Sequence, residues 1–503
     1  MSADSRVRHL SAGELISAVL DAGSFTSWDD PGPKSYPGAS PAYEDELRHA
    51  REKSGVDESV LTGEGLIHGR RVAVIVSEFT FLAGSIGNVA AHRIAAAIRR
   101  ATAERLPLLA GPASGGTRMQ EGTPAFLSMV DITGAVRGHR QAGLPYLVYL
   151  RHPTTGGVMA SWGSLGHVTV AEPGALLGFL GPRVYEALYG EPFSSGVQTA
   201  ENLFDKGLID AVVPPEQLAG VVDKALTILL ADASEPPEPP STVTVRPGAH
   251  TAWESILISR NRRRPDLRRL LAHGARDVLP LNGTGQGEKD PGLLLALARF
   301  GNQPCVVLGH QRPRHPGDSV MGPASLREAR RGMKLAEELG LPLLTVIDTA
   351  GADLSKEAEE GGLAGEIARS LHDLIGLASP SVSVLLGQGA GGGALALLPA
   401  DSTIAAQHAW LSPLPPEGAS AIMYRTLDRA ADMAESQGVK VGVLLERGVV
   451  DHLVDERPDA ADEGRAFCER MAAAIEYELA RVNDLPTADR LERRAGKYRA
   501  GAG

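Results

Sequence analysis

Residues 144–161, LPYLVYLRHPTTGGVMAS, contain the pattern that decides the fold: a β-like apolar run, a glycine-rich turn and a helix-like segment follow one another without interruption. Residues 379–396, SPSVSVLLGQGAGGGALA, repeat this order, and Gly157 and Gly393 lie 236 positions apart. The two stretches predict two equivalent corners at which a strand passes into a helix.

Two further pairs of segments flank these corners at almost the same spacing. LPLLAGPASGG begins at residue 106 and LPLLTVIDTAG at residue 341, an offset of 235. LLGFLGPR at 176–183 and WLSPLPPE at 410–417 are offset by 234. Self-similarity at a nearly constant, long period indicates a duplicated domain, because unrelated segments would not keep their spacing.

Each half alternates helical stretches with short β-like runs, which predicts an α/β fold with a largely parallel sheet. Ligands of such sheets lie at the carboxyl ends of the strands, where the glycine turns fall. The proline-rich segment 232–247, DASEPPEPPSTVTVRP, can continue neither a helix nor a sheet and separates the halves. The expected organisation is an N-terminal leader (1–55), a first domain (56–231), a linker (232–250), a second domain (251–490) and a tail (491–503).

The composition excludes several classes of protein. With 503 residues, the chain exceeds the size of about 250–300 residues at which one core stops growing. A net charge of −11 opposes general nucleic-acid binding, which needs a basic face. Cys305 and Cys468 are too few for a disulfide framework or a four-cysteine zinc site, and no apolar run reaches the ~18 residues of a membrane span. We expect a cytoplasmic enzyme that binds neither nucleic acid nor membrane.

The glycine turns can stabilise negatively charged oxygen. In the first turn, TTGG at 154–157, glycine lets the backbone approach a ligand, and the helix that follows leaves its first amides unpaired. The second turn, GGGA at 391–394, has the same position after a strand. Two oxyanion sites predict two carbonyl substrates, whereas the alternative is that these glycines only allow close helix packing.

Other chemistries find little support in the sequence. Gly387, Gly389 and Gly392 formally match a dinucleotide fingerprint, but no acidic residue follows at the expected spacing of ~20 residues. A GxSxG nucleophile elbow, a P-loop, an HExxH motif and a CxxC motif are all absent. Glu121 lies beside a glycine-rich segment, but we do not expect it to act as a catalytic acid or base.

The order of the motifs resembles a known family. Between residues 82 and 210, AGSIGNVAAHRI, SGGTRMQEG, AGLPYLVYLRHPTTGGVMAS, AEPGALLGFLGPRV and GLID resemble the β subunit of bacterial acetyl-CoA carboxylase carboxyltransferase. From residue 252 onward, AWESILISRNRRRP, VVLGHQRPR, LPLLTVIDTAGA, EEGGLAGEIAR, VSVLLGQGAGGGALAL and LSPLPPEGASAI resemble the α subunit. The resemblance implies two tandem crotonase-like (ClpP/crotonase) domains fused in one chain, as in the actinobacterial form.

The resemblance also implies a reaction and its partners. A carboxyl group would pass from carboxybiotin, supplied by biotin carboxylase on a separate biotin carboxyl carrier protein, to an acyl-CoA, with acetyl-CoA giving malonyl-CoA as the first expectation. The enzyme itself would need no metal. The active site would lie between the first half of one protomer and the second half of another, so a homo-oligomer, a dimer or larger, is expected.

The family's site residues carry over by motif. Gly156 and Gly157 would hold the thioester oxygen, while Gly393 and Ala394 would hold the ureido oxygen of biotin. Gly115, Gly116 and Gly392 are expected at the substrates, and Arg118 is expected as a CoA-phosphate or structural partner. A cluster of arginines could also meet CoA phosphates, although a solvated helix end is an alternative: Arg260, Arg262, Arg263 and Arg264.

The chain departs from the family at two places. It lacks the four-cysteine zinc ribbon of the β subunit, and DTAGADLS from Asp348 replaces the usual DTPGAYPG, which leaves the acyl preference open. Three other readings remain: a decarboxylase of malonyl thioesters, a non-catalytic subunit of a carboxylase complex, and a crotonase-type hydratase, for which no suitable glutamate pair is evident.

Overall fold

The computed structural model describes residues 9–30, 39–233, 237–240, 250–313 and 320–499. The chain divides into two compact units, Met1–Leu226 and Thr227–Gly503, and each is considered by itself. Most of the expected linker and the last four residues of the expected tail lie outside the described residues. The domain boundaries expected from the sequence stay a prediction.

The first unit is built on a seven-stranded sheet in the order β1-β2-β3-β4-β5-β7-β9. The pairs β1·β2 and β2·β3 are antiparallel, and every later pair is parallel. The strands are β1 (Thr26–Ser27), β2 (Val60–Ile67), β3 (Arg70–Ser77), β4 (Leu108–Gly111), β5 (Tyr146–Leu150), β7 (Val168–Ala171) and β9 (Ala211–Val212). A separate parallel pair joins β6 (Thr154–Thr155) to β8 (Leu177–Gly178).

The second unit repeats this topology strand for strand, in the order β10-β11-β12-β13-β14-β15-β16. Its first two pairs are antiparallel and the remaining pairs parallel, as in the first unit. The strands are β10 (Asp277–Leu281), β11 (Leu293–Phe300), β12 (Gln303–His310), β13 (Leu343–Thr349), β14 (Ser381–Gly389), β15 (Ser402–Ala406) and β16 (His452–Val454). The predicted α/β duplication is therefore confirmed.

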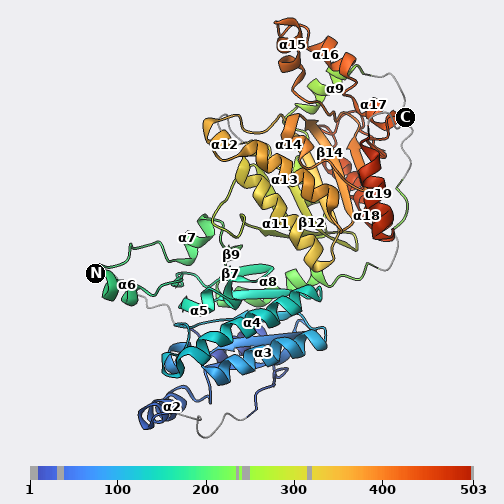
Figure 1. Ribbon diagram of the computed structural model, residues 1–503. Helices are drawn as coiled ribbons and strands as arrows, with labels where there is room; N and C mark the ends of the chain where they lie inside the picture. The colour runs from blue at the N-terminus through green and yellow to red at the C-terminus, as the bar shows by residue number, and fades with distance from the viewer. Residues whose placement is uncertain (1–8, 31–38, 234–236, 241–249, 314–319, 500–503) are drawn as a thin grey trace, which may run out of the picture. The chain divides into compact units, whose positions relative to one another are not determined.

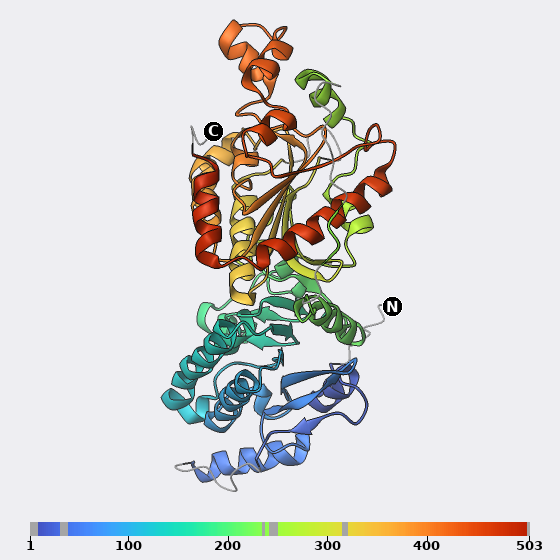
Figure 2. The ribbon, with the colours of Figure 1, turned by 90° about the vertical axis from the view of Figure 1, so that its right-hand side faces the viewer.

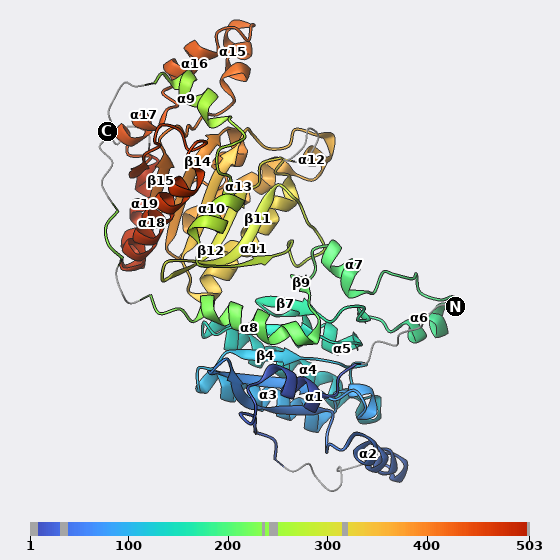
Figure 3. The ribbon, with the colours of Figure 1, turned by 180° about the vertical axis from the view of Figure 1, so that it is seen from behind.

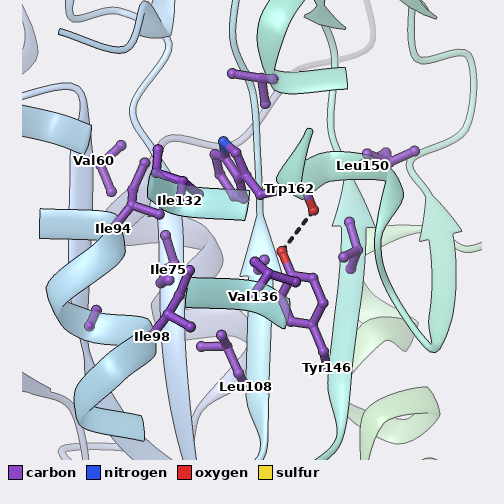
Figure 4. Close-up of a cluster of buried hydrophobic side chains, with 14 of the residues drawn as sticks. Val60, Ile75, Ile94, Ile98, Leu108, Ile132, Val136, Tyr146, Leu150 and Trp162 are labelled. Atoms are coloured by element: carbon purple, nitrogen blue, oxygen red, sulfur yellow. Dashed lines mark hydrogen bonds between the residues drawn. The ribbon is translucent and has the colours of Figure 1, made fainter. Parts of the chain in front are cut away.

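Helices cover both faces of the first sheet (Figure 1). One face packs against α3 (Asn88–Ala103) and α4 (Gly122–Gln141); Figure 4 shows the apolar side chains of these helices meeting the strands around Trp162, whose carbonyl accepts a 2.7 Å hydrogen bond from the Tyr146 hydroxyl. Apolar residues of α1 (Ala12–Val19) and α8 (Pro215–Leu229) lie against the other face. Side chains of β3 alternate between the two faces accordingly, with Ile75 toward α3 and Val74 toward α1. The remaining helices of this unit are α2 (Pro41–Ser54), α5 (Gly156–Met159), α6 (Pro182–Tyr189), α7 (Ala200–Asp205) and the 3₁₀ turns at Leu82–Gly84, Met119–Glu121 and Trp162–Ser164.

The second sheet is covered in the same way (Figures 2 and 3). The helices α11 (Pro323–Leu339) and α13 (Leu363–Gly376) pack on one face, while α18 (Gly464–Asn483) crosses the other face and packs against α10 (Leu267–Gly274). The long apolar strands of both sheets are buried on both faces, which is why they lack a polar alternation. The remaining helices are α9 (Ala252–Ser259), α12 (Lys356–Glu360), α14 (Gly391–Leu395), α15 (Pro416–Tyr424), α16 (Ala430–Gln437), α17 (Val441–Glu446) and α19 (Thr487–Lys497).

Candidate functional site

The first glycine turn is a sharp corner between β6 and α5. Gly156 takes a φ of +60°, which favours glycine, and its amide donates a 2.9 Å hydrogen bond to the Phe179 carbonyl. The next two amides, of Gly157 and Val158, are the second and third of the helix and so have no acceptor within it. No acceptor elsewhere among the described residues takes them. This corner therefore offers two adjacent free amides.

The second glycine turn has the same construction. Gly391 takes a φ of +68°, and its amide donates a 2.9 Å hydrogen bond to the Ser412 carbonyl. The free amides at this corner belong to Gly392 and Gly393, which likewise have no acceptor in the described parts of the chain. Ala394 is the fourth residue of α14, so its amide points along the helix toward Ala390.

The free amides differ by one residue from those expected on the sequence. The expected donors were Gly156 with Gly157 and Gly393 with Ala394, but the Gly156 amide is already bonded and the Ala394 amide lies in the helical turn. The positions that carry free amides are therefore 157 and 158 in the first unit and 392 and 393 in the second.

The hydrogen bonds around the two corners match at an offset of exactly one repeat, 235 residues. The Thr155 amide donates to the Ser114 carbonyl at 2.9 Å, and the Ala390 amide donates to the Thr349 carbonyl at 3.1 Å. Two further pairs of bonds repeat at the same offset. The Gly116 amide donates to the Ser114 hydroxyl, as the Gly351 amide does to the Thr349 hydroxyl. The Arg118 amide donates to the Ile86 carbonyl, as the Asp353 amide does to the Met321 carbonyl. The duplicated corners thus share one backbone frame.

The structure brings the predicted glycines of the first unit together. A Cβ built on Gly156 would lie 3.3 Å from both the Gly115 oxygen and the Gly116 Cα, and one on Gly116 would lie 3.4 Å from the Gly157 nitrogen. Gly116 itself takes a φ of +111°. The loop at 114–118 and the first corner therefore form one continuous backbone surface, in which side chains would intrude.

In the second unit, the loop of the unusual DTAGADLS segment takes the equivalent place. A Cβ on Gly393 would lie 3.3 Å from the Ala352 nitrogen and 3.2 Å from the Met321 methyl group. A Cβ on Gly392 would lie 2.7 Å from the Ile367 side chain of α13. The departure from the family pattern therefore lies directly against the second corner.

Arg118 is held inside the first unit. Its side chain is fully buried and makes an ion pair with the equally buried Glu58, a contact of the structural kind that was one of its two expected roles. Burial alone would lower the pKa of Arg118, but the hydrogen bond and charge of Glu58 outweigh this effect and raise it. Glu121, adjacent in this cluster, accepts hydrogen bonds from the Tyr43 hydroxyl at 2.6 Å and from the Asn88 amide at 2.5 Å.

The arginine cluster of the second unit is also largely occupied. Arg264 is buried and ion-paired with Glu456 and Asp459. Arg260 forms a bidentate pair with Glu417 of α15, at 2.6 and 3.0 Å. A further pair joins Arg263 to Asp462. Arg262 and Arg263 are both exposed, and within the described residues Arg262 is the one of the four without an ion pair.

Sequence reasoning missed the polar groups beneath the second corner. His310, at the end of β12, is buried, and its Nδ1 lies 3.3 Å from the Val346 carbonyl oxygen. Burial lowers the pKa of His310 to about 4, although the Asp348 carboxylate and the Gly393 backbone act in the opposite direction. His310 lies within VVLGHQRPR, but scattered histidines indicate packing or surface positions more often than sites.

Asp348 and Arg312 form a second buried feature beside His310. The two side chains make a bidentate ion pair, and the Asp348 carboxylate also accepts the Gln388 amide at 3.1 Å. A Cβ on Gly387 would lie 2.6 Å from Asp348 Oδ1, so the strand glycine makes room for the pair. Within the described ranges, no group of three or more His, Cys, Asp or Glu side chains can hold a metal ion, and no helix has the length and hydropathy for crossing a membrane.

Comparison with known proteins places the chain. A family model described as carboxyl transferase domain matches residues 19–489. A Mycobacterium tuberculosis protein named probable biotin-dependent acyl-coenzyme A carboxylase beta3 subunit is 59% identical over 490 residues, covering 97% of this chain and 98% of that protein. The acetyl-coenzyme A carboxylase carboxyl transferase subunits beta/alpha of Salinispora arenicola are 35% identical over 515 residues, covering 97% and 90%.

A solved structure shares the fold. The transcarboxylase 12S hexamer, with methylmalonyl-coenzyme A and methylmalonic acid bound, aligns with a TM-score of 0.71 at 21% identity, over 92% of this chain and 89% of that chain. The expected fold class, two tandem crotonase-like domains, is confirmed. The chain belongs to the carboxyl transferase domain family and is a carboxyltransferase of the biotin-dependent acyl-CoA carboxylase type.

Proposed function

We propose that the protein transfers a carboxyl group from carboxybiotin, held on a separate carrier protein, to acetyl-CoA, giving malonyl-CoA. The N–C bond to the carboxyl carbon breaks, the ureido group takes the α-proton of the thioester, and the α-carbon bonds to the carboxyl carbon. Negative charge develops on the thioester oxygen and on the ureido oxygen. The observation that carries the proposal is the pair of free amides at each of two equivalent corners.

The amide pairs divide between the two substrates. The amides of Gly157 and Val158 receive the thioester oxygen, and those of Gly392 and Gly393 receive the ureido oxygen. A preorganised amide donor in an acyl-transfer site is worth roughly 2.7–4 kcal/mol in the transition state. No side-chain base is required, because the ureido group itself accepts the proton, which agrees with the uncharged side chains at both corners.

Reversal of the reaction tests this proposal. The purified protein is incubated with malonyl-CoA in the presence and absence of biocytin, and acetyl-CoA formation is followed by chromatography. We expect formation that depends on biocytin. Loss of CO₂ without biocytin would instead support a malonyl-thioester decarboxylase. The absence of turnover, even with the carrier and biotin carboxylase added, would support a non-catalytic subunit.

The choice of acyl group needs its own experiment. Acetyl-CoA carboxylase is the name of the Salinispora relative, whereas the more similar Mycobacterium relative is named only for acyl-CoA. A panel of malonyl-CoA, methylmalonyl-CoA and longer 2-carboxyacyl-CoAs, compared by kcat/KM, measures the preference. We expect malonyl-CoA to rank first, and a higher kcat/KM for any longer substrate would contradict the assignment to acetyl-CoA.

We also propose that the protein acts as a homo-oligomer of two or more copies, in the cytoplasm. Exposed apolar side chains recur at equivalent positions in both units, and association would cover them: Met119 and Leu354, Phe179 and Leu414, Leu188 and Met423, and Tyr189 and Tyr424. The helices α6 and α15, which carry two of these pairs, both begin with proline and end at a residue with positive φ. Light scattering of the wild type and of Tyr189→Ser should show a smaller assembly for the variant.

A further inference from the structure

The loop at 114–118 of the first unit is held to two distant parts of the chain, residues 58–59 and Ser85, through one side chain. The Arg118 guanidinium donates to the Glu58 carboxylate, to the Ser85 carbonyl at 2.8 Å and to the Ser59 hydroxyl at 3.2 Å. Both Arg118 and Glu58 have no exposed surface. Moving Arg118 would therefore leave a buried charge without its partner, a strongly unfavourable state.

Helix α2, which the sequence assigned to a surface leader, reaches the same cluster. The Tyr43 hydroxyl donates to Glu121 at 2.6 Å, and the Arg118 guanidinium lies 3.4 Å from the Tyr43 oxygen. Tyr43, Leu47 and Ala50 are buried and pack with Phe81 in one apolar cluster. Helix α2 thus covers the buried side of this loop.

The fastened loop is the one that abuts the first corner. Two backbone hydrogen bonds join this loop to residues 83–86. The Gly115 amide donates to the Ala83 carbonyl, and the Ile86 amide donates to the Gly116 carbonyl, both at 2.9 Å. A Cβ on Gly87 would lie 2.3 Å from the Glu121 carboxylate and 2.7 Å from the Arg118 guanidinium, so a side chain at this position would displace members of the cluster. Displacement of the loop would carry Gly116 toward or away from the Gly157 amide.

The second unit has no such anchor at the equivalent position. Asp353 replaces Arg118 there, and its carboxylate accepts hydrogen bonds from the amide and the hydroxyl of Ser355, both at 3.0 Å. The anchor is therefore specific to the unit whose corner is proposed to bind the thioester.

We propose that Arg118 and Tyr43 are positioning residues for acyl-CoA, which hold the loop at 114–118 against the first corner without touching the substrate themselves. This inference rests on the proposed function, because it concerns the binding of acyl-CoA at the same corner. The position of the loop then sets the KM for acyl-CoA and leaves the KM for biocytin unchanged.

The test uses the full chain and the malonyl-CoA and biocytin reaction. Tyr43→Phe removes only the hydroxyl group, and Arg118→Lys keeps the charge but loses the bidentate geometry. Arg71→Lys is the matched control, because Arg71 pairs with Glu64 and Glu104 on the exposed side of the same unit. Melting temperatures identify any variant that is globally destabilised.

We expect the KM for malonyl-CoA to rise roughly fivefold in Tyr43→Phe and tenfold or more in Arg118→Lys, as loss of hydrogen bonds to charged groups predicts. The KM for biocytin and both constants of Arg71→Lys should stay within about twofold of the wild type, the range that an exposed pair allows. Two results would overturn the inference and leave the proposed function standing, provided that the wild type is active. In the first, both KM values of Tyr43→Phe equal those of the wild type; in the second, its KM for malonyl-CoA and its KM for biocytin rise equally. An inactive wild type would instead overturn the proposed function.

Discussion

The two glycine corners share a backbone frame but are supported by different side chains. In the first unit, a buried arginine on the loop itself is fixed by Glu58 and, through Glu121, by helix α2. In the second unit, the support lies beneath the strand ends, in the ion pair of Arg312 with Asp348 and in the neutral His310. The difference shows that duplication preserves the backbone frame, while each copy has its own side chains that hold this frame.

Blocking the free amides should have the largest effect and should separate the corners. In Gly157→Val, the new side chain begins 3.0 Å from the Thr117 hydroxyl and covers the amides of the first corner; in Gly392→Val it begins 2.7 Å from Ile367. We expect turnover to fall by about 10²–10³-fold in each. Calorimetry should show weakened malonyl-CoA binding only in Gly157→Val.

The matched control is Gly134→Ala, in the middle of α4, where nothing lies within 4 Å of the new methyl group. This variant should keep full activity and gain up to about 1 kcal/mol of helix stability. Equal loss of malonyl-CoA binding in both valine variants would refute the division of the corners between two substrates.

Breaking the two buried ion pairs should compare the supports directly. Glu58→Gln removes the fully buried partner of Arg118 and leaves Glu121, 3.2 Å away, as its remaining counter-charge. We expect the free energy of unfolding of the first unit to fall by about 3–5 kcal/mol. Asp348→Asn should cost less, about 1–3 kcal/mol, because Arg312 keeps 17% of its side chain exposed to water. Urea denaturation measures both.

Asp131→Asn provides the reference for that comparison, since the Arg99–Asp131 pair is more than half exposed at both side chains. Its effect should stay below about 1 kcal/mol. A larger loss in Asp348→Asn than in Glu58→Gln would reverse the order of the two supports.

The duplication and the two corners could be predicted from the sequence, because a strand, a glycine turn and a helix each leave a local pattern. The free amides could not be predicted, because they depend on two features of the folded chain. Gly156 takes a positive φ, and its amide donates to the Phe179 carbonyl beside the two-stranded sheet of β6 and β8. The three consecutive glycines at 391–393 also make the alignment of the two halves ambiguous by one residue. The sequence comparison pairs Gly157 with Gly393, whereas the hydrogen bonds pair Gly156 with Gly391 and therefore Gly157 with Gly392.

The partners of Arg118 could not be predicted for a related reason. Its partners Glu58 and Tyr43 lie 60 and 75 positions away, and no local pattern joins them. The resemblance therefore left a CoA-phosphate and a structural role open for Arg118. The fold adds the buried contacts of its guanidinium, which favour the structural role.

Acidification should weaken both units, and the two buried histidines with the largest lowering of the pKa are His139 and His310. Burial lowers the pKa of His139 in α4 and of His310 in β12 to about 4, below the value of about 6.5 in an unfolded chain. The unfolded state therefore binds protons that the folded state rejects between pH 6.5 and 4. Stability is lost as the pH falls through this window, by up to about 3 kcal/mol for each histidine.

Thermal unfolding between pH 7.5 and 4.5 measures this loss, and His310→Asn and His139→Asn remove one proton site each. Each variant is less stable than the wild type at pH 7.5 but should lose less additional stability on acidification. An unchanged pH slope in either variant would show that its histidine is protonated in the folded state.

The smallest effect is expected at the arginines that the sequence placed near CoA. Arg260 is bidentate to Glu417, and the Arg260 hydrogen bond lowers the pKa of that carboxyl, so the pair stays ionised at neutral pH. Because the pair joins α9 to α15 and is about one third exposed, Arg260→Gln should cost under about 1 kcal/mol of stability and leave the KM for malonyl-CoA within about twofold. Arg262→Gln tests, in the same assay, the exposed member of the cluster that has no ion pair among the described residues. A tenfold rise in the KM for malonyl-CoA in either variant would mean that a CoA phosphate binds an arginine of the second unit. The first unit alone would then no longer account for the binding of the thioester substrate.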